Sequence, residues 1–118
     1  MKYVCLVYLE EGLFGTLSPE QKEKLDSDSL AYDKQLEAKG KLIAAEALQS
    51  VKTARSVTRR NGKRLVTDGP FAETKEQLIG FVMIEAAGED EALEIASHIP
   101  LAAMGKVEVR AIYDIPGA

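Results

Sequence analysis

The stretch QLIGFVMIEA, residues 77–86, decides the predicted fold, because it is a strand with apolar side chains on both faces. One face presents Leu78, Gly80, Val82 and Ile84, and the other presents Ile79, Phe81 and Met83. The stretch YVCLVY, residues 3–8, shows the same two-faced pattern. A continuous apolar run of this length is consistent with a buried strand. We therefore predict that these two stretches form central strands of one sheet.

One amphipathic helix is expected before that strand in the chain, and another is expected after it. Ser18 is a typical N-cap, Pro19 suits the first helical position, and Gln21 completes a capping box. This helix ends near Gly40, which suits a left-handed C-cap. Its inward stripe is predicted to be Leu25, Ser29, Tyr32 and Leu36. The second helix is predicted over residues 89–99, with an acidic first turn and an apolar stripe of Ala92, Ile95, Ala96 and Ile99.

The remaining strands complete an α+β domain. Strands are predicted at 41–48 and 106–113, and a hairpin at 54–67 turns on Asn61-Gly62, the strongest short-range hairpin signal. The order is β-α-β-(hairpin)-β-α-β. This order predicts a ferredoxin-like, split βαβ sheet with two helices on one face and an inserted β-hairpin. The 118 residues, 1–118, are expected to form a single domain.

An uncovered apolar sheet face predicts a second copy of the chain. Two helices cover only one face of such a sheet, yet the strands at 3–8 and 78–84 are apolar on both. An exposed apolar surface of that size marks an interaction site. We expect a homodimer that packs sheet to sheet about a two-fold axis.

Composition and charge exclude several classes of function. The net charge of -4 and a pI near 5.1 argue against direct nucleic-acid binding and against binding to acidic membranes. The apolar run after Lys2 is too short for a signal peptide or a membrane span, so a cytoplasmic location is expected. One His and one Cys provide no metal-ligand set, and no phosphate-binding glycine pattern is present, so neither a metal nor a cofactor is expected. Cys5 is expected to be a buried strand residue.

Several polar side chains are candidates for a site, each with a structural alternative. His98 either forms an i,i+4 pair with Glu94 or acts in proton transfer. Ser29 and Tyr32 either satisfy hydrogen bonds in the core or line a cavity under the sheet. Arg110 shares a strand face with Glu108, which suggests either an ion pair or a cleft. A basic hairpin is either a solvated ribbon or a grip for an anionic ligand; its basic residues are Arg55, Arg59, Arg60, Lys63 and Arg64.

The segment TDGPFAETKEQLIGF, residues 67–81, contains the most ambiguous candidate, Asp68. Asp68-Gly69-Pro70 is typical of a turn, and Phe71 is expected to plug into the core and anchor the loop. A carboxylate at a strand end beside a rigid turn also suits a general base or a ligand contact. The residues alone leave Asp68 open between a turn residue and a functional carboxylate.

The same segment, with Gly80-Phe81, resembles the hallmark of the DGPF-domain family within the YCII-related group. The likeness extends to Asp90-Glu91-Ala92-Leu93 and Val107-Glu108-Val109-Arg110 and covers nearly the whole chain. The resemblance implies a ferredoxin-like fold that dimerises into an α+β barrel. It also implies that some relatives use a His-Asp pair, that one branch eliminates halide from a chlorinated ring compound, and that DGPF proteins are often encoded near sigma factors.

The chain departs from that pattern at both catalytic positions. Ser29 stands where the family's histidine is expected, and Ile99 stands where its aspartate is expected. Two functions therefore remain open. One is a small-molecule-binding or accessory protein with a cleft that involves Ser29, Tyr32, Phe71 and Arg110. The other is a cofactor-free lyase or isomerase with Asp68 as base, assisted by His98 or Tyr32.

Overall fold

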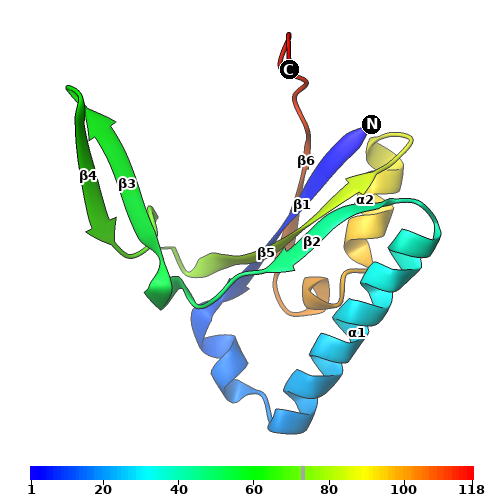
Figure 1. The fold of residues 1–118 in the computed structure, drawn as a ribbon. Coiled ribbons are helices and arrows are strands. Elements are labelled where there is room, and N and C mark those ends of the chain that lie inside the picture. Colours follow the sequence, from blue (N-terminus) through cyan, green and yellow to red (C-terminus); the bar gives the residue numbers. More distant parts are fainter. Residues whose placement is uncertain (73) are drawn as a thin grey trace.

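The computed structural model describes residues 1–72 and 74–118 and is a mixed α+β protein built on a four-stranded antiparallel sheet. The sheet order is β2-β5-β1-β6, so the two strands with two apolar faces are central, as predicted. The strands are β1 (Lys2–Glu10), β2 (Leu42–Ala47), β5 (Glu76–Glu85) and β6 (Lys106–Ala111) (Figure 1). This order is compatible with the ferredoxin-like arrangement expected from the sequence.

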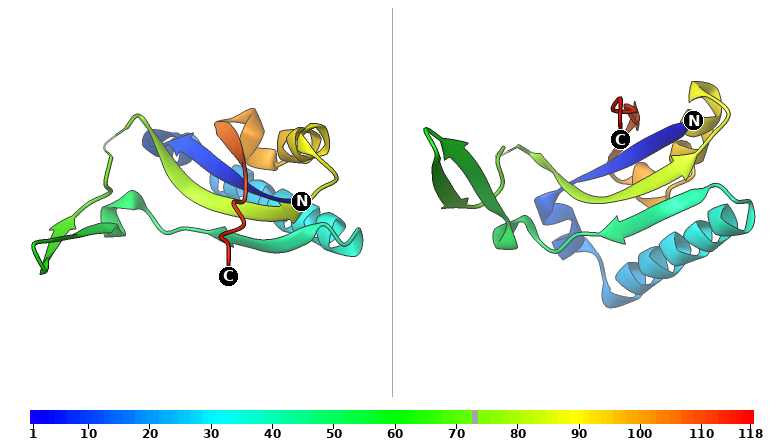
Figure 2. Two further views of the ribbon diagram at one scale, coloured as in Figure 1. Left: turned by 90° about the horizontal axis from the view of Figure 1, so that it is seen from above. Right: turned by 45° about the horizontal axis from the view of Figure 1, so that its top comes forward.

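Two α-helices, α1 (Pro19–Ala38) and α2 (Glu89–Ser97), lie on one face of the sheet (Figures 1 and 2). The structure also has short 3-10 segments: η1 (Glu11–Thr16) follows β1, η2 (Val51–Thr53) follows β2, and η3 (Pro100–Ala103) follows α2. The helix α2 ends at Ser97 and is shorter than the predicted 89–99. Ile99 is already extended, which the following Pro100 favours, and η3 begins at Pro100.

The first helix begins and ends as its local chemistry predicts. The Ser18 hydroxyl accepts a hydrogen bond from the Gln21 amide, and the Gln21 side chain accepts one from the Ser18 amide. This capping box satisfies two otherwise free donors. Gly40 adopts a φ of 69°, the left-handed conformation expected for the residue after the C-cap.

The core lies between the helices and one face of the sheet. Alternate residues of β1 and β5 point into it, and from the helices it receives Leu36 and the α2 stripe. Cys5 is fully buried, and burial raises the pKa of its thiol to about 11. A buried thiol that stays protonated is a packing residue rather than a nucleophile. The sheet side chains in the core are Tyr3, Cys5, Val7, Val82 and Ile84.

The opposite face of the sheet is apolar and is covered by neither α-helix. Val4 pairs with Met83 across β1 and β5, and Leu6 pairs with Phe81, and all four side chains are partly exposed. We call these side chains, with Tyr8, the bare face. A face of this kind was the basis for expecting a second copy of the chain.

The predicted hairpin is present and forms a separate two-stranded sheet of β3 (Arg55–Arg60) and β4 (Lys63–Asp68). Asn61 and Gly62 have φ values of 51° and 75°, as a primed two-residue turn requires. The hairpin stands away from the helices and leaves an open V between itself and the rest of the molecule (Figure 1). The molecule is consequently flat and extended, 47 × 46 × 19 Å with a radius of gyration of 16.2 Å.

The expectation that Phe71 anchors its loop in the core is wrong for the single chain. Phe71 lies after the hairpin and is 95% exposed. The turn before it still behaves as predicted, since Gly69 adopts a φ of 96° that a residue with a side chain rarely takes.

Candidate functional site

A large cleft lies between α1 and the helix-covered face of the sheet. It has a volume of 1110 Å³, slightly above the usual range of about 300–1,000 Å³ for small-molecule sites. Its floor is formed by β1, β2 and β5, its roof by α1, and its ends by η1 and η3.

The cleft exists because α1 packs closely on the core only near its C-terminal end. Leu36 is buried, whereas Ser29 and Leu25, two and three turns earlier, are partly exposed. The helix and the sheet diverge toward the N-terminal half of α1, and η1 crosses the wide end (Figure 1). The polar Ser29 in the inward stripe provides little apolar surface to draw this part of the helix onto the sheet.

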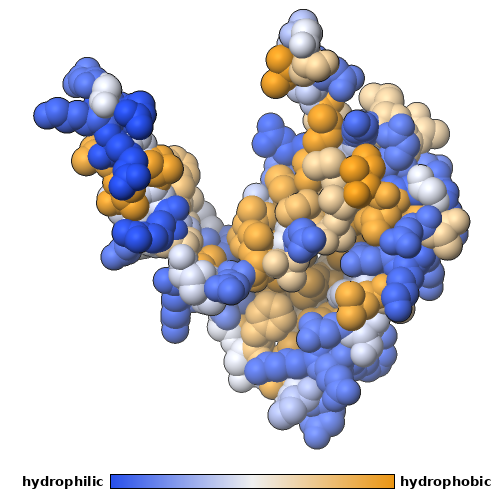
Figure 3. Space-filling model, in the orientation of Figure 1, coloured by the Kyte–Doolittle hydropathy of each residue, from blue (hydrophilic) through white to orange (hydrophobic). Residues whose placement is uncertain are grey.

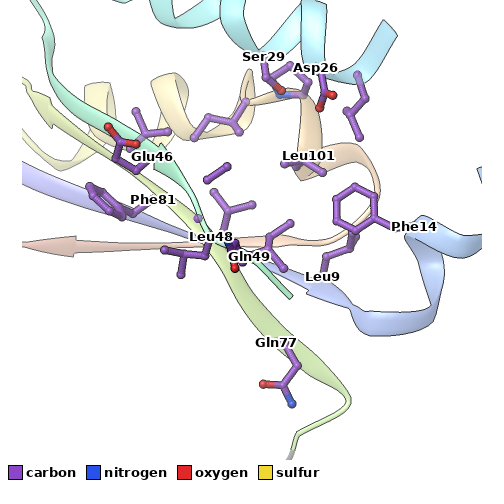
Figure 4. A pocket seen from close by; sticks show the side chains of 18 of the residues that line it. Leu9, Phe14, Asp26, Ser29, Glu46, Leu48, Gln49, Gln77, Phe81 and Leu101 are labelled. Atoms are coloured by element: carbon purple, nitrogen blue, oxygen red, sulfur yellow. The ribbon is translucent and has the colours of Figure 1, made fainter. Parts of the chain in front are cut away.

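Apolar side chains form most of the cleft wall. Leu9 and Phe14 come from the end of β1 and from η1, Leu101 comes from η3, and Leu48 follows β2 (Figure 4). These four side chains converge on the cleft from separate parts of the chain. An apolar wall with a few polar groups is typical of pockets that bind small organic molecules.

The charged groups of the cleft are mainly carboxylates. Asp26, Ser29 and Asp33 are spaced three and four residues apart and so form a row on one side of α1. Burial raises the pKa of the Asp33 carboxyl above its ordinary value. In the part of the chain that the structure describes, the acidic residues that line the cleft are Glu10, Glu11, Asp26, Asp33 and Glu46, and the basic one is Lys52.

Tyr32 borders the cleft but its hydroxyl is already engaged. It donates a hydrogen bond of 2.7 Å to the carbonyl oxygen of Ile95 in α2. Burial is the main cause of the raised pKa of this hydroxyl, with smaller contributions from Cys5 and Glu94. Tyr32 therefore links α1 to α2 and holds the closed end of the cleft.

Comparison with known proteins identifies the family. The YCII-related domain matches residues 1–116. An uncharacterised protein of Rhizobium meliloti (strain 1021) is 38% identical over 112 residues, which cover 93% of this chain and 90% of that protein. The chain belongs to the YCII-related family. Neither match names an activity, so the function of this YCII-related protein has to be inferred from its structure.

Three of the residues singled out from the sequence lie at or beside the cleft. Ser29 and Tyr32 line it, and the Ser29 side chain points toward it from α1 (Figure 4). His98 lies next to Tyr32, with ring centroids 6.5 Å apart, but is not among the residues that line the cleft. His98 Nε2 lies 2.8 Å from Glu94 Oε1, which is the i,i+4 pair considered from the sequence.

Asp68 and Phe71 lie at the hairpin of this YCII-related protein rather than at the cleft. The Asp68 carboxylate is 92% exposed, and its Oδ1 is 3.3 Å from Nε of Arg55 on the neighbouring strand. The Asp68 backbone ends β4, and the following Gly69 amide donates to the Ala54 carbonyl at 2.8 Å. Within residues 1–72 and 74–118, neither Asp68 nor Phe71 lines the cleft.

Arg110 belongs to a third region. It lies on β6 opposite Val4, so it borders the bare face on the side of the sheet away from the cleft. Glu108 shares that face and accepts a long hydrogen bond of 3.5 Å from the Tyr8 hydroxyl. The candidate residues are thus divided among the cleft, the hairpin and the bare face.

Most of the cleft wall was not predicted from the sequence, although one signal was available. Asp26 and Asp33 flank Ser29 at helical spacing, so a polar row beside an apolar stripe was visible in α1. Leu9, Phe14 and Leu101 show no such signal, because only the tertiary fold brings them together.

In the described part of the chain, no helix is long and apolar enough to cross a membrane.

Proposed function

We propose that this YCII-related protein binds a small organic molecule in the cleft between α1 and the sheet. The 1110 Å³ cleft carries the proposal, because its size and apolar wall suit such a ligand. The ligand's apolar body contacts Leu9, Phe14 and Leu101, and a polar group of the ligand reaches the row on α1.

The charges around the cleft favour neutral or cationic ligands over anionic ones. Among residues 1–72 and 74–118, five carboxylates and one ammonium group line it, so an anion entering the cleft meets net repulsion. Asp33 has the strongest reason to interact, because a partner with positive charge would offset the burial that raises its pKa.

Ligand binding is better supported than catalysis in which Asp68 and His98 act together. A general base must come within hydrogen-bond reach of its substrate, through at most one water. Asp68 is almost fully exposed on the hairpin, and His98 is paired with Glu94 on α2. Ser29, in the position of the family's histidine, has no basic nitrogen.

The proposal is tested by filling the cleft. Ser29→Trp places a large ring in the cleft, whereas Ser27→Trp places the same ring on an exposed position of the same helix. The chain has no tryptophan, so each variant also carries a single fluorescent reporter. Three probes with one naphthalene body are titrated into each protein: 1-naphthylmethylamine, 1-naphthalenemethanol and 1-naphthalenesulfonate.

We expect the amine and the alcohol to bind the native protein and Ser27→Trp, and the sulfonate to bind more weakly. Ser29→Trp is expected to lose all three. Equal binding of the probes to Ser29→Trp and Ser27→Trp would remove the cleft as the site. A preference for the sulfonate would keep the cleft but contradict its charge preference.

We also propose that the protein is a homodimer that uses its bare face, and that it belongs to the DGPF branch of the family. The first proposal is supported by the apolar pairs Val4–Met83 and Leu6–Phe81. The second is supported by the segment 67–81. A link to sigma-factor regulation follows only from the DGPF resemblance, and co-purification with a sigma factor encoded nearby tests it.

A further inference from the structure

The β3–β4 hairpin is not stabilised by packing on the rest of its own chain. Its base is held by the Gly69–Ala54 hydrogen bond and by the Ser56 hydroxyl, which donates to the Gly69 carbonyl at 3.0 Å. Among the described residues, β3 and β4 pack extensively only on each other. An isolated two-stranded hairpin is marginally stable in water. This hairpin therefore needs another surface to be a fixed part of the structure.

Apolar side chains on the hairpin are left in solvent. Val57 and Val66 lie opposite each other and are exposed, and Leu65 on the other face of the ribbon is 59% exposed. Phe71 follows the hairpin and is more exposed still. Figure 3 shows hydrophobic side chains on both sides of the V between the hairpin and the body. The V is thus a hollow with apolar walls.

The charge of the hairpin is opposite to that of the body. Residues 55–68 contain five basic side chains and one acidic one, a net charge of +4, and because the whole chain carries -4, the rest carries -8. Opposite charges of this size on one chain favour contact between the hairpin of one copy and the body of another.

We propose that the β3–β4 hairpin, together with Phe71, is an arm that clasps the body of a second copy of this chain. The apolar side chains of the arm and Phe71 are buried on that copy, and the basic side chains lie against its acidic surface. The second copy occupies the V, in contact with both the arm and the bare face. This proposal is independent of ligand binding in the cleft.

Phe71→Ala is the most direct test, because a side chain that is 95% exposed contributes no packing to its own chain. The variant is expected to keep the stability of the monomer and to weaken dimerisation by about tenfold or more. The double variant Val57→Ser/Val66→Ser is expected to act in the same direction. Leu93→Ala, on the exposed side of α2, is the matched control and is expected to dimerise like the native protein. Dissociation constants are measured by analytical ultracentrifugation.

Hydrogen exchange distinguishes an interface that includes the arm from one that uses the bare face alone. In the native dimer the β3 and β4 amides are expected to be protected, and dilution below the dissociation constant or raised salt should remove this protection. A dimer whose affinity is unchanged in both arm variants would overturn the proposal and leave the bare face as the whole interface. A native chain that is monomeric at 100 μM, or an arm protected only by added duplex DNA, would also overturn it.

Discussion

At the scale of single residues, Asp33 is a carboxylate that destabilises the protein whenever it is ionised. It lies partly buried at the cleft, and burial raises its pKa above 3.8. A raised pKa means that the folded state binds this proton more tightly than the unfolded state does. The contribution of the protonated Asp33 carboxyl to folding stability is present below the unfolded pKa and is lost as pH rises through the folded pKa.

Asp33→Asn is therefore expected to raise the melting temperature at pH 7. The gain should shrink as pH falls toward 4, because the native carboxyl then becomes protonated. Thermal unfolding followed by circular dichroism over pH 4–8 measures this difference. Glu23→Gln, at an exposed position of the same helix, is the control and should show no comparable gain.

Glu91 is the opposite case. Its Oε1 accepts a hydrogen bond of 2.7 Å from Lys41 Nζ and another of 3.1 Å from the Ala87 amide. These two bonds, the Lys41 bond first, lower the pKa of Glu91. Its contribution to stability is present above the ordinary value of 4.5 and is lost as pH falls through the folded pKa.

Glu91→Gln is accordingly expected to destabilise the protein at pH 7. The difference from the native chain should disappear in acid, where the native carboxylate is protonated. Urea unfolding at pH 7 and at a series of lower pH values, continued below 4.5, provides the comparison. A deficit that does not shrink along this series would contradict the assigned role of the ionised carboxylate.

At the scale of elements, local chemistry predicted what forms but not how far apart the elements lie. The capping box at Ser18 and the turn at Asn61-Gly62 are satisfied by neighbours in the chain, so the sequence specifies both. The gap between α1 and the sheet depends on packing across the fold, and no local signal predicts it. Phe71 was misplaced for the same reason, since an aromatic side chain suits a core and an interface equally.

The approach of β2 to β5 at the cleft requires a glycine. A Cβ added at Gly80 would lie 2.8 Å from the carbonyl oxygen of Glu46, which belongs to the β2 backbone. Gly80→Ala must shift β2, and overpacking of this kind costs about 1–3 kcal/mol. Gly12→Ala is the matched control, because an added Cβ meets nothing there within 4 Å. Urea unfolding of the two variants measures the difference.

At the scale of the whole molecule, the bare face and the arm predict that folding and association are coupled. If the second copy stabilises the folded chain, the melting temperature rises with protein concentration. We expect the melting temperature of the native protein to rise between 1 and 100 μM, an about hundredfold range of protein concentration. Differential scanning fluorimetry across that range measures it.

Phe71→Ala should flatten this concentration dependence without lowering the melting temperature of the dilute protein. A melting temperature that does not vary with concentration in the native chain would mean that the folded monomer is self-sufficient. The dimer proposals would then lose their energetic basis, whereas the cleft proposal would be unaffected.

The extended outline of the chain has a consequence for how its size is read in solution. A compact domain of this length has a radius of gyration of about 13.5 Å, and 16.2 Å corresponds to a compact protein of about 190 residues. A single chain would therefore elute from a size-exclusion column at an apparent mass above its true mass, and would scatter X-rays like a larger particle. A pair whose copies fill each other's hollows would be only modestly wider. Absolute mass, rather than apparent diameter, distinguishes the two states.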